Sequence, residues 1–341
     1  MRKHQANVTN YRHVPSSGNT DKNNEYKLAM AIDFNISRRL LIASLLLAIW
    51  TGRLNAQQVA DTAYMPEIQQ PEYNSGEGPI IFIDEGHHNF HTKDGRYSTF
   101  ASVLERDGYT VKAYKGEFKS THLATGRILV ISNALNKVNV SNWSLPTASA
   151  FTTDEVETVK TWVENGGSLF LIADHMPMAG AARDLAAAFG FEFTNGFAME
   201  KGSGFGSKFT IKDGTLAESI VTKGRNADET VNQVVTFTGQ AFKTPKRATP
   251  ILIFDDRFTN KLPKKAWQFD KDTREHGIKG WSQGAYMKFG NGRVVMSGEA
   301  AMFTAQLAGR HKVKMGMNSE VAKENYKLLL NIIHWLDGRL D

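Results

Sequence analysis

The chain of 341 residues contains no cysteine. This absence excludes disulfide bonds, zinc–thiolate sites, iron–sulfur ligation, a thiol nucleophile and a lipidated N-terminal cysteine. The sequence also lacks a hydrophobic run long enough to span a bilayer. The apolar segment 40–50 has 11 residues, whereas a membrane-spanning helix needs about 20.

The excess of positive over negative charge is small outside the N-terminal segment. The whole chain has a net charge of +6, but residues 1–56 carry eight basic and three acidic side chains, and the remaining residues carry 33 and 32. A protein that binds nucleic acid needs a concentrated basic surface. We therefore expect no nucleic-acid partner.

The N-terminal segment has the layout of a secretory signal peptide. Arg38 and Arg39 precede the apolar run, and the small-residue sequence 54–56 follows it as a cleavage site. We expect residues 1–56 to be a signal peptide with an N-terminal extension, cleaved near Ala56. The mature protein would be periplasmic or secreted, without stable membrane insertion. Residues 37–41 also fit twin-arginine export, so both export routes stay open.

The rest of the chain alternates between short apolar runs and amphipathic segments. This alternation predicts an α/β domain over residues 79–341, with a mostly parallel sheet and helices on both faces. Residues 57–78 are predicted to be a flexible tether, and residues 191–284 a β-rich insertion or sheet extension. The predicted strands are 79–84, 110–114, 127–132, 168–173 and 293–297, and the predicted helices are 98–107, one starting at Thr152 or Thr153, 177–189 and 325–336.

Polar residues follow several predicted strands, and ligands of open α/β sheets bind at the carboxyl ends of the strands. The first strand is followed by Asp84, Glu85, His87, His88, Asn89 and His91, the third by Asn133, the fourth by Asp174 and His175, and the last by Glu299. We expect the loops after the first and fourth strands to share one pocket, with Asn133 between them. His88 and His175 are predicted to be its most important residues.

This set of side chains suits acid–base or metal chemistry. We assign catalysis to His88, His175, Asp174 and Glu299, and substrate binding to Glu85, His87, Asn89, His91 and Asn133. A His–carboxylate pair performs general acid–base catalysis near neutral pH. A divalent metal is an alternative, with Asp84, His87, His91 and Asp174 as candidate ligands. Structural roles also stay open, since Asp84, Asp174 and Glu299 are able to cap turns or helices and one of His87 and His88 to pack.

Four segments resemble a known family: IDEGHHNFHTKDGRYSTFASVLERDGYTV, FTTDEVETVKTWVENGGSLFLIADHMPMAGAARDLAAAFG, GRVVMSGEAAMF and NIIHWLDG. They are similar to exported bacterial proteins with a class I glutamine amidotransferase-like domain, to which the ThuA-like group is related. The resemblance implies a flavodoxin-like fold. True amidotransferases place a cysteine at a strand-to-helix elbow, where this chain has Ala173 to Met176. Glutamine hydrolysis by a thiol is therefore excluded.

Three functions remain open at this stage. The first is an exported hydrolase or lyase-type enzyme that acts on a small polar or carbohydrate-like substrate. The second is a non-catalytic module that binds a ligand or a partner of the cell envelope, and the third is a structural envelope protein. The density of histidines favours the enzyme, because sugar clefts are built mainly from aromatic and amide side chains.

Overall fold

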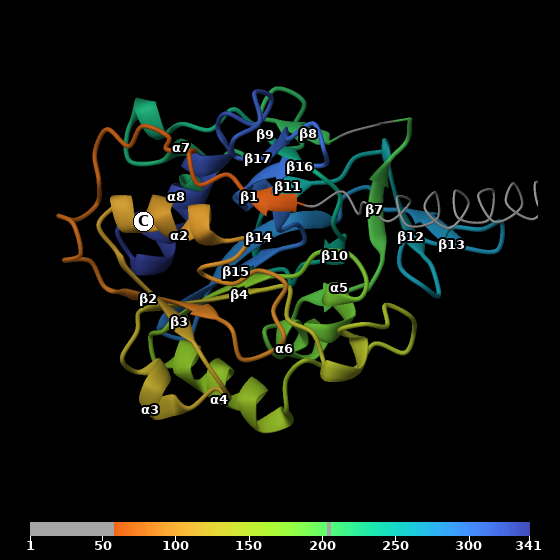
Figure 1. The fold of residues 1–341 in the computed structure, drawn as a ribbon, viewed down its shortest axis with the longest axis horizontal. Coiled ribbons are helices and arrows are strands. Elements are labelled where there is room, and N and C mark those ends of the chain that lie inside the picture. The colour runs from red at the N-terminus through yellow and green to blue at the C-terminus, as the bar shows by residue number, and fades with distance from the viewer. Residues whose placement is uncertain (1–57, 203–205) are drawn as a thin grey trace, which may run out of the picture. The chain divides into compact units, whose positions relative to one another are not determined.

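The computed structural model describes residues 58–202 and 206–341 (Figure 1). The predicted signal peptide lies outside the described residues. Within the described part of the chain, no helix is both long and apolar enough to cross a membrane.

A mixed sheet forms the centre of the described domain. Its parallel part has the order β3-β2-β4-β5-β15, and each neighbouring pair is parallel. These strands are β2 (Ile80–Asp84), β3 (Thr110–Tyr114), β4 (Ile128–Ser132), β5 (Ser168–Ile172) and β15 (Gly292–Ser297). An antiparallel part continues the sheet with β14 (Ser282–Phe289), β10 (Phe242–Lys243) and β6 (Glu192–Phe193), while β11 (Thr249–Ile253) pairs with β14.

Helices cover both faces of this sheet (Figure 1). Helices α2 (Ser98–Arg106) and α8 (Asn325–Asp337) lie on one face, and α3 (Ser120–Leu123), α4 (Thr153–Glu164) and α6 (Arg183–Ala188) lie on the other. Successive side chains of a strand point to opposite faces. Ile81 and Ile83 accordingly join the core under α2 and α8, whereas Phe82 joins the core under α4.

The helix predicted over 177–189 is interrupted. The chain forms α5 (Met178–Ala181) and then α6, with a break at Ala182. Ala181 is the last residue of α5. Its carbonyl oxygen accepts a hydrogen bond from the N–H of Ala150, 2.9 Å away. A loop far away in the sequence therefore contacts the chain where the helix is interrupted.

The segment 191–284 forms both predicted alternatives. Part of it extends the central sheet through β6, β10 and β11, and the rest forms separate antiparallel sheets. One contains β7 (Phe197–Glu200), β12 (Phe258–Leu262) and β13 (Arg274–Gly277); the other contains β8 (Ser207–Thr210) and β9 (Gln233–Thr236). The short helix α7 (Ile220–Lys223) and the 3-10 turns η1 (Lys137–Asn139), η2 (Ala227–Glu229) and η3 (Ala301–Phe303) complete the connections.

The described part of the predicted tether is fixed to the domain, which corrects the expectation of flexibility. Strand β1 (Gln58–Ala60) pairs with β16 (Ala305–Ala308), which in turn pairs with β17 (Val313–Gly316). Further along, the hydroxyl of Tyr73 donates to Asp337 Oδ2 at 2.5 Å. Polar composition suggested a free segment, but these long-range bonds hold it in place.

Candidate functional site

A pocket of about 270 Å³ lies where the loops after β2, β4, β5 and β15 meet. Five of the residues predicted from the sequence line it: His91, Asn133, Asp174, His175 and Glu299. The loops after the first and fourth predicted strands thus share one pocket, and β4 lies between their strands. The wall is completed by Gln58, Phe90, Arg96, Trp143, Met178, Phe237, Thr238, Trp267, Ala301, Gln306 and Met315.

Asn133 connects the loops on either side of it. Its backbone is in the left-handed region at φ 49°, where asparagine is tolerated better than most residues. Its side-chain oxygen accepts from the N–H of Asp174 at 2.8 Å, and its carbonyl accepts from the N–H of Phe90 at 3.0 Å. Asn133 therefore sets the position of the Asp174 backbone in the pocket.

Glu299 and Asp174 form the acidic part of the pocket. Glu299 is only 1 % exposed, and its two carboxyl oxygens accept from the N–H groups of Ala301 at 2.8 Å and Met302 at 2.7 Å. Burial and the neighbouring Asp174 nevertheless raise the pKa of Glu299 well above its ordinary value. Two adjacent carboxyl groups resist ionising together, and the burial of Glu299 acts in the same direction.

His175 has one ring nitrogen engaged and one facing no described partner. Its Nδ1 lies 2.7 Å from the carbonyl oxygen of Met176, which only accepts hydrogen bonds, so Nδ1 carries the proton. In the neutral ring, Nε2 is then left with its lone pair. The ring stacks on Phe197 at 4.4 Å and meets Trp267 edge-on at 4.7 Å. These contacts fix the orientation of the imidazole.

His91 is a neutral wall residue. Burial, with a smaller contribution from the Arg96 guanidinium, lowers the pKa of His91 to about 3. Its Nδ1 lies 3.3 Å from the hydroxyl oxygen of Ser132, and its ring packs against Tyr97 at 4.6 Å. His91 is therefore uncharged at neutral pH and acts as a hydrogen-bonding surface.

His87 belongs to a separate buried cluster, not to the pocket. Its Nδ1 lies 2.9 Å from Asp84 Oδ2 and its Nε2 lies 2.8 Å from Glu155 Oε1, so both ring nitrogens are engaged. Phe118 and Phe151 pack on the ring at 4.5 and 4.9 Å. The predicted substrate-binding role of His87 is therefore replaced by a structural one, because its nitrogens are already occupied.

The other residues that the sequence singled out in the first loop, His88, Glu85 and Asn89, also lie outside the pocket wall. The side chain of His88 is exposed, and its backbone adopts φ 46°. Glu85 accepts from the N–H of Lys93 at 2.8 Å, and Asn89 donates to Asp84 Oδ2 at 2.9 Å. The predicted sharing of one pocket by His88 and His175 is thus corrected: the loop turns His91 inward instead.

The candidate metal ligands are not gathered at one point. Asp84 and His87 bond to each other in the buried cluster, whereas His91 and Asp174 line the pocket. Among residues 58–202 and 206–341, no three or more His, Asp or Glu side chains are arranged to hold a metal ion. No metal ligand set is therefore assigned to this pocket.

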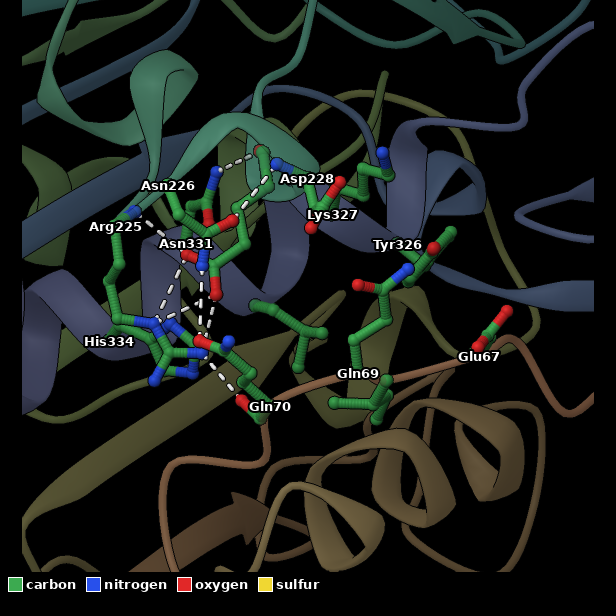
Figure 2. Close-up of a pocket in the computed structure, with 13 residues that line it drawn as sticks. Glu67, Gln69, Gln70, Arg225, Asn226, Asp228, Tyr326, Lys327, Asn331 and His334 are labelled. Atoms are coloured by element: carbon green, nitrogen blue, oxygen red, sulfur yellow. Dashed lines mark hydrogen bonds and ion pairs between the residues drawn. The ribbon is translucent and has the colours of Figure 1, made fainter.

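A second, smaller pocket of about 110 Å³ lies between residues 67–70, the turn η2 and helix α8 (Figure 2). Two of its charged groups are paired: Arg225 bonds to Glu229, and it also bonds to Glu72 outside the pocket wall and donates to the carbonyl of Gln70. Figure 2 shows Asn226 bonded to the Gln70 side chain as well. This pocket contains none of the side chains predicted to be functional, and its bonds hold the N-terminal segment to the domain.

Sequence patterns did not point to the aromatic and cationic part of the main pocket. Trp143 and Trp267 come from loops without periodicity, and Trp267 is 51 % exposed with its backbone at φ 65°. Of these pocket residues, Arg96 was the one that the strand-end rule could have indicated, because it lies in the loop after the first strand, five residues after His91. Gln306 comes from β16, which was not predicted as a strand.

Neither a protein-family model nor a curated protein matches the sequence. Solved structures do match. The structure described as "mmIFT52 N-terminal domain" has a TM-score of 0.52 at 14% identity, covering 75% of this chain and 97% of its own. A putative ThuA-like protein from Bacteroides uniformis has a TM-score of 0.41 at 13% sequence identity, and the match covers 77% of this chain and 94% of that protein. Another, from Parabacteroides merdae, has a TM-score of 0.40 at 12% sequence identity, and the match covers 76% of this chain and 90% of that protein.

These matches bear on the fold alone. The similarity to the first structure extends over almost all of that domain, so the arrangement of strands and helices described above recurs in a solved protein. ThuA-like proteins are among the structural neighbours at lower TM-scores. At sequence identities this low, the matches do not indicate that this chain shares a substrate or an activity with these proteins.

Proposed function

We propose that this chain is an exported, ThuA-like member of the class I glutamine amidotransferase-like proteins with a flavodoxin-like core. We propose further that it is a hydrolase or lyase-type enzyme for a small polar or carbohydrate-like substrate. The family assignment rests on the four sequence segments quoted above. It is supported by the parallel order β3-β2-β4-β5-β15, which in chain order is second, first, third, fourth and fifth.

The observation that carries the enzymatic proposal is the Asp174–Glu299 pair in the pocket. Burial and Asp174 hold the pKa of Glu299 well above its ordinary value. General acid–base catalysis needs one group that gives a proton and one that accepts it, and a buried carboxyl group whose pKa is raised suits the first role. Glu299 is then the acid, and Asp174 or the Nε2 atom of His175 is the base.

The aromatic walls favour a polyhydroxylated ligand. Phe90, Trp143 and Trp267 line the pocket together with amide side chains from Asn133 and Gln306. Sugar rings pack their C–H faces on aromatic rings and hydrogen-bond to amides through their hydroxyls. A volume of about 270 Å³ accommodates a small ligand of this kind.

The test compares turnover by the wild type, Asp174→Asn and Glu299→Gln on a panel of disaccharides, measured as released reducing sugar. We expect each substitution to lower turnover about a hundredfold or more. Asp256→Asn is the matched control, since Asp256 forms an exposed ion pair with Lys279. Binding of the panel without turnover by the wild type would identify a non-catalytic binding module instead. Absence of both would refute the carbohydrate-like substrate.

Export is tested separately. The signal-peptide sequence 1–56 predicts that the exported protein begins near Gln57. N-terminal sequencing of protein recovered from the periplasm or the medium checks this. Recovery of an uncleaved chain from the cytoplasm alone would contradict the proposal.

A further inference from the structure

Arg96 is a cation on the wall of the main pocket. It lies in the loop between β2 and α2, two residues before the helix begins. Its guanidinium carbon sits 3.8 Å from the centre of the Phe90 ring, which is also part of the wall. This cation–π contact holds the guanidinium in place without neutralising its charge.

Arg96 has no carboxylate partner among the described residues. Arg225, Arg257 and Arg293 each form an ion pair with an acidic side chain within 3.0 Å. For Arg96 the described part of the chain offers one hydrogen bond, from Nη1 to Gln58 Oε1, at 3.5 Å. A guanidinium has five N–H donors, so most of the donors of Arg96 have no partner within residues 58–202 and 206–341.

An unpaired, partly buried cation is unfavourable unless something compensates it. Burial lowers the pKa of Arg96, and no acidic group acts against that effect. His91, a titratable neighbour of Arg96, is neutral because its pKa is lowered to about 3. The carboxyl groups of Asp174 and Glu299 line the same pocket, but neither forms an ion pair with Arg96 among the described residues. The positive charge of Arg96 therefore faces the pocket without an acidic partner among the described residues, where an anionic group of a ligand would pair with it.

The remaining charges of the pocket restrict which anion fits. Arg96 is the only Lys or Arg among the described residues that line it, and Asp174 lies in the same cavity. A phosphate carries a charge of about −1.5 to −2 at pH 7, which one guanidinium opposite a carboxylate does not balance. A carboxylate carries one charge and matches the planar guanidinium with two parallel hydrogen bonds.

We propose that Arg96 binds a carboxylate of the ligand, so that the preferred substrates are acidic sugars of the uronic acid type rather than neutral sugars. This inference rests on the proposed function, because it specifies the substrate class of the same pocket. Phe90 orients the guanidinium, Arg96 recognises the acid group, and the sugar ring extends toward Asp174 and Glu299.

The experiment measures binding of D-glucuronate, D-glucose and acetate to the full chain by isothermal titration calorimetry. The proteins are the wild type, Arg96→Gln, Arg96→Lys and Arg247→Gln. Arg247 is a matched control, since its guanidinium also lies over a phenylalanine, Phe289, at 4.7 Å and it does not line the pocket. Thermal melts of all four proteins report whether each variant folds.

We expect the wild type to bind D-glucuronate at least about tenfold more tightly than D-glucose, the ratio that one charge-assisted pair provides. Arg96→Gln should abolish this preference and leave D-glucose binding unchanged. Arg96→Lys should keep part of it, and Arg247→Gln should keep all of it.

The failures are distinguishable. Equal binding of D-glucose and D-glucuronate by the wild type would overturn the role of Arg96 and leave the proposed carbohydrate-like substrate standing. Acetate binding as tight as that of D-glucuronate would keep the carboxylate site but contradict the sugar. Absence of binding by all three probes would overturn both the acidic substrate class and the carbohydrate-like ligand.

Discussion

The Nε2 atom of His87 lies 2.8 Å from Oε1 of Glu155 and thereby joins the loop after β2 to the first turn of α4. Glu155 is also the third helical residue of a capping box with Thr152. The carboxyl group of Glu155 therefore both caps the N-terminus of α4 and forms a hydrogen bond with the ring of His87. Because all three groups of the Asp84–His87–Glu155 cluster are buried, the cluster should be important for stability.

Replacing His87 should destabilise the fold. His87→Ala leaves two buried carboxyl groups without their shared partner, and breaking a buried ion pair in this way costs about 3–5 kcal/mol. Urea denaturation of the variant and the wild type at pH 6 measures the difference. His88→Ala is the control, since His88 is exposed, and a loss of equal size in both variants would contradict the structural role of the cluster.

The same cluster predicts a pH optimum of stability. Burial lowers the pKa of His87, but Asp84 and Glu155 outweigh it and raise the pKa above its ordinary 6.5. The resulting stabilisation is complete below pH 6.5 and is lost as the pH rises through the raised value. Burial raises the pKa of Glu155, but hydrogen bonds from Thr152, His87 and Phe118 lower it below its ordinary 4.5.

The Glu155 contribution is therefore present above pH 4.5 and is lost on further acidification through the lowered pKa. Together the two groups stabilise the fold most between pH 4.5 and 6.5. The difference in urea midpoint between the wild type and the double variant His87→Ala/Glu155→Gln should be largest in this window. A difference that does not change between pH 4 and 9 would refute the assignment.

Glu299→Gln should change the pH dependence of stability in the opposite sense to an ordinary surface carboxylate. The pKa of Glu299 is raised in the folded protein by burial and by Asp174, so ionisation at rising pH opposes folding. The amide cannot ionise. Relative to the wild type, the variant should gain stability as the pH rises above 4.5, the ordinary pKa of a glutamate. Thermal melts from pH 4 to pH 9 check this, and a gain on acidification would contradict it.

Trp267→Gly should weaken ligand binding without weakening the fold. The side chain is 51 % exposed on the pocket wall, and φ 65° is a backbone conformation that glycine adopts without strain. We expect D-glucuronate to bind about tenfold more weakly, in line with the loss of one large aromatic contact, with an unchanged melting temperature. Retention of wild-type affinity would show that Trp267 does not contact the ligand.

His175→Ala and His88→Ala should differ sharply. His175 lines the pocket with a free Nε2 atom, whereas the side chain of His88 is exposed outside it. Turnover on the disaccharide panel should fall about a hundredfold or more for His175→Ala and stay at the wild-type level for His88→Ala. Loss of turnover in the His88 variant alone would restore the original assignment of the first loop.

The two strands in the middle of the parallel part were predictable because they are short runs of buried, mostly apolar residues. All five residues of Ile128–Ser132 are buried, as are all five of Ser168–Ile172, so neither strand depends on a pattern that a distant partner alters. The break in the predicted helix at Ala182 was not predictable in the same way. It coincides with a hydrogen bond between Ala181 and Ala150, which lies more than 30 residues earlier in the chain.

The strand-end rule likewise located Asn133, Asp174, His175 and Glu299, because sheet topology alone brings them to one edge. It did not tell His87, His88 and His91 apart. His87 is held outside the pocket by a hydrogen bond to Glu155, which lies 68 positions later in the chain. A contact over that separation in the sequence leaves no local signal. The aromatic walls come from irregular loops, for which local sequence holds no comparable rule.

The position of Trp267 makes the pocket observable by its own fluorescence. Its indole is half exposed, and its ring centre lies 4.7 Å from that of His175. A ligand that covers the indole should shift its emission to shorter wavelength and protect it from iodide. Occupancy of the pocket is thus measurable in solution without an added label.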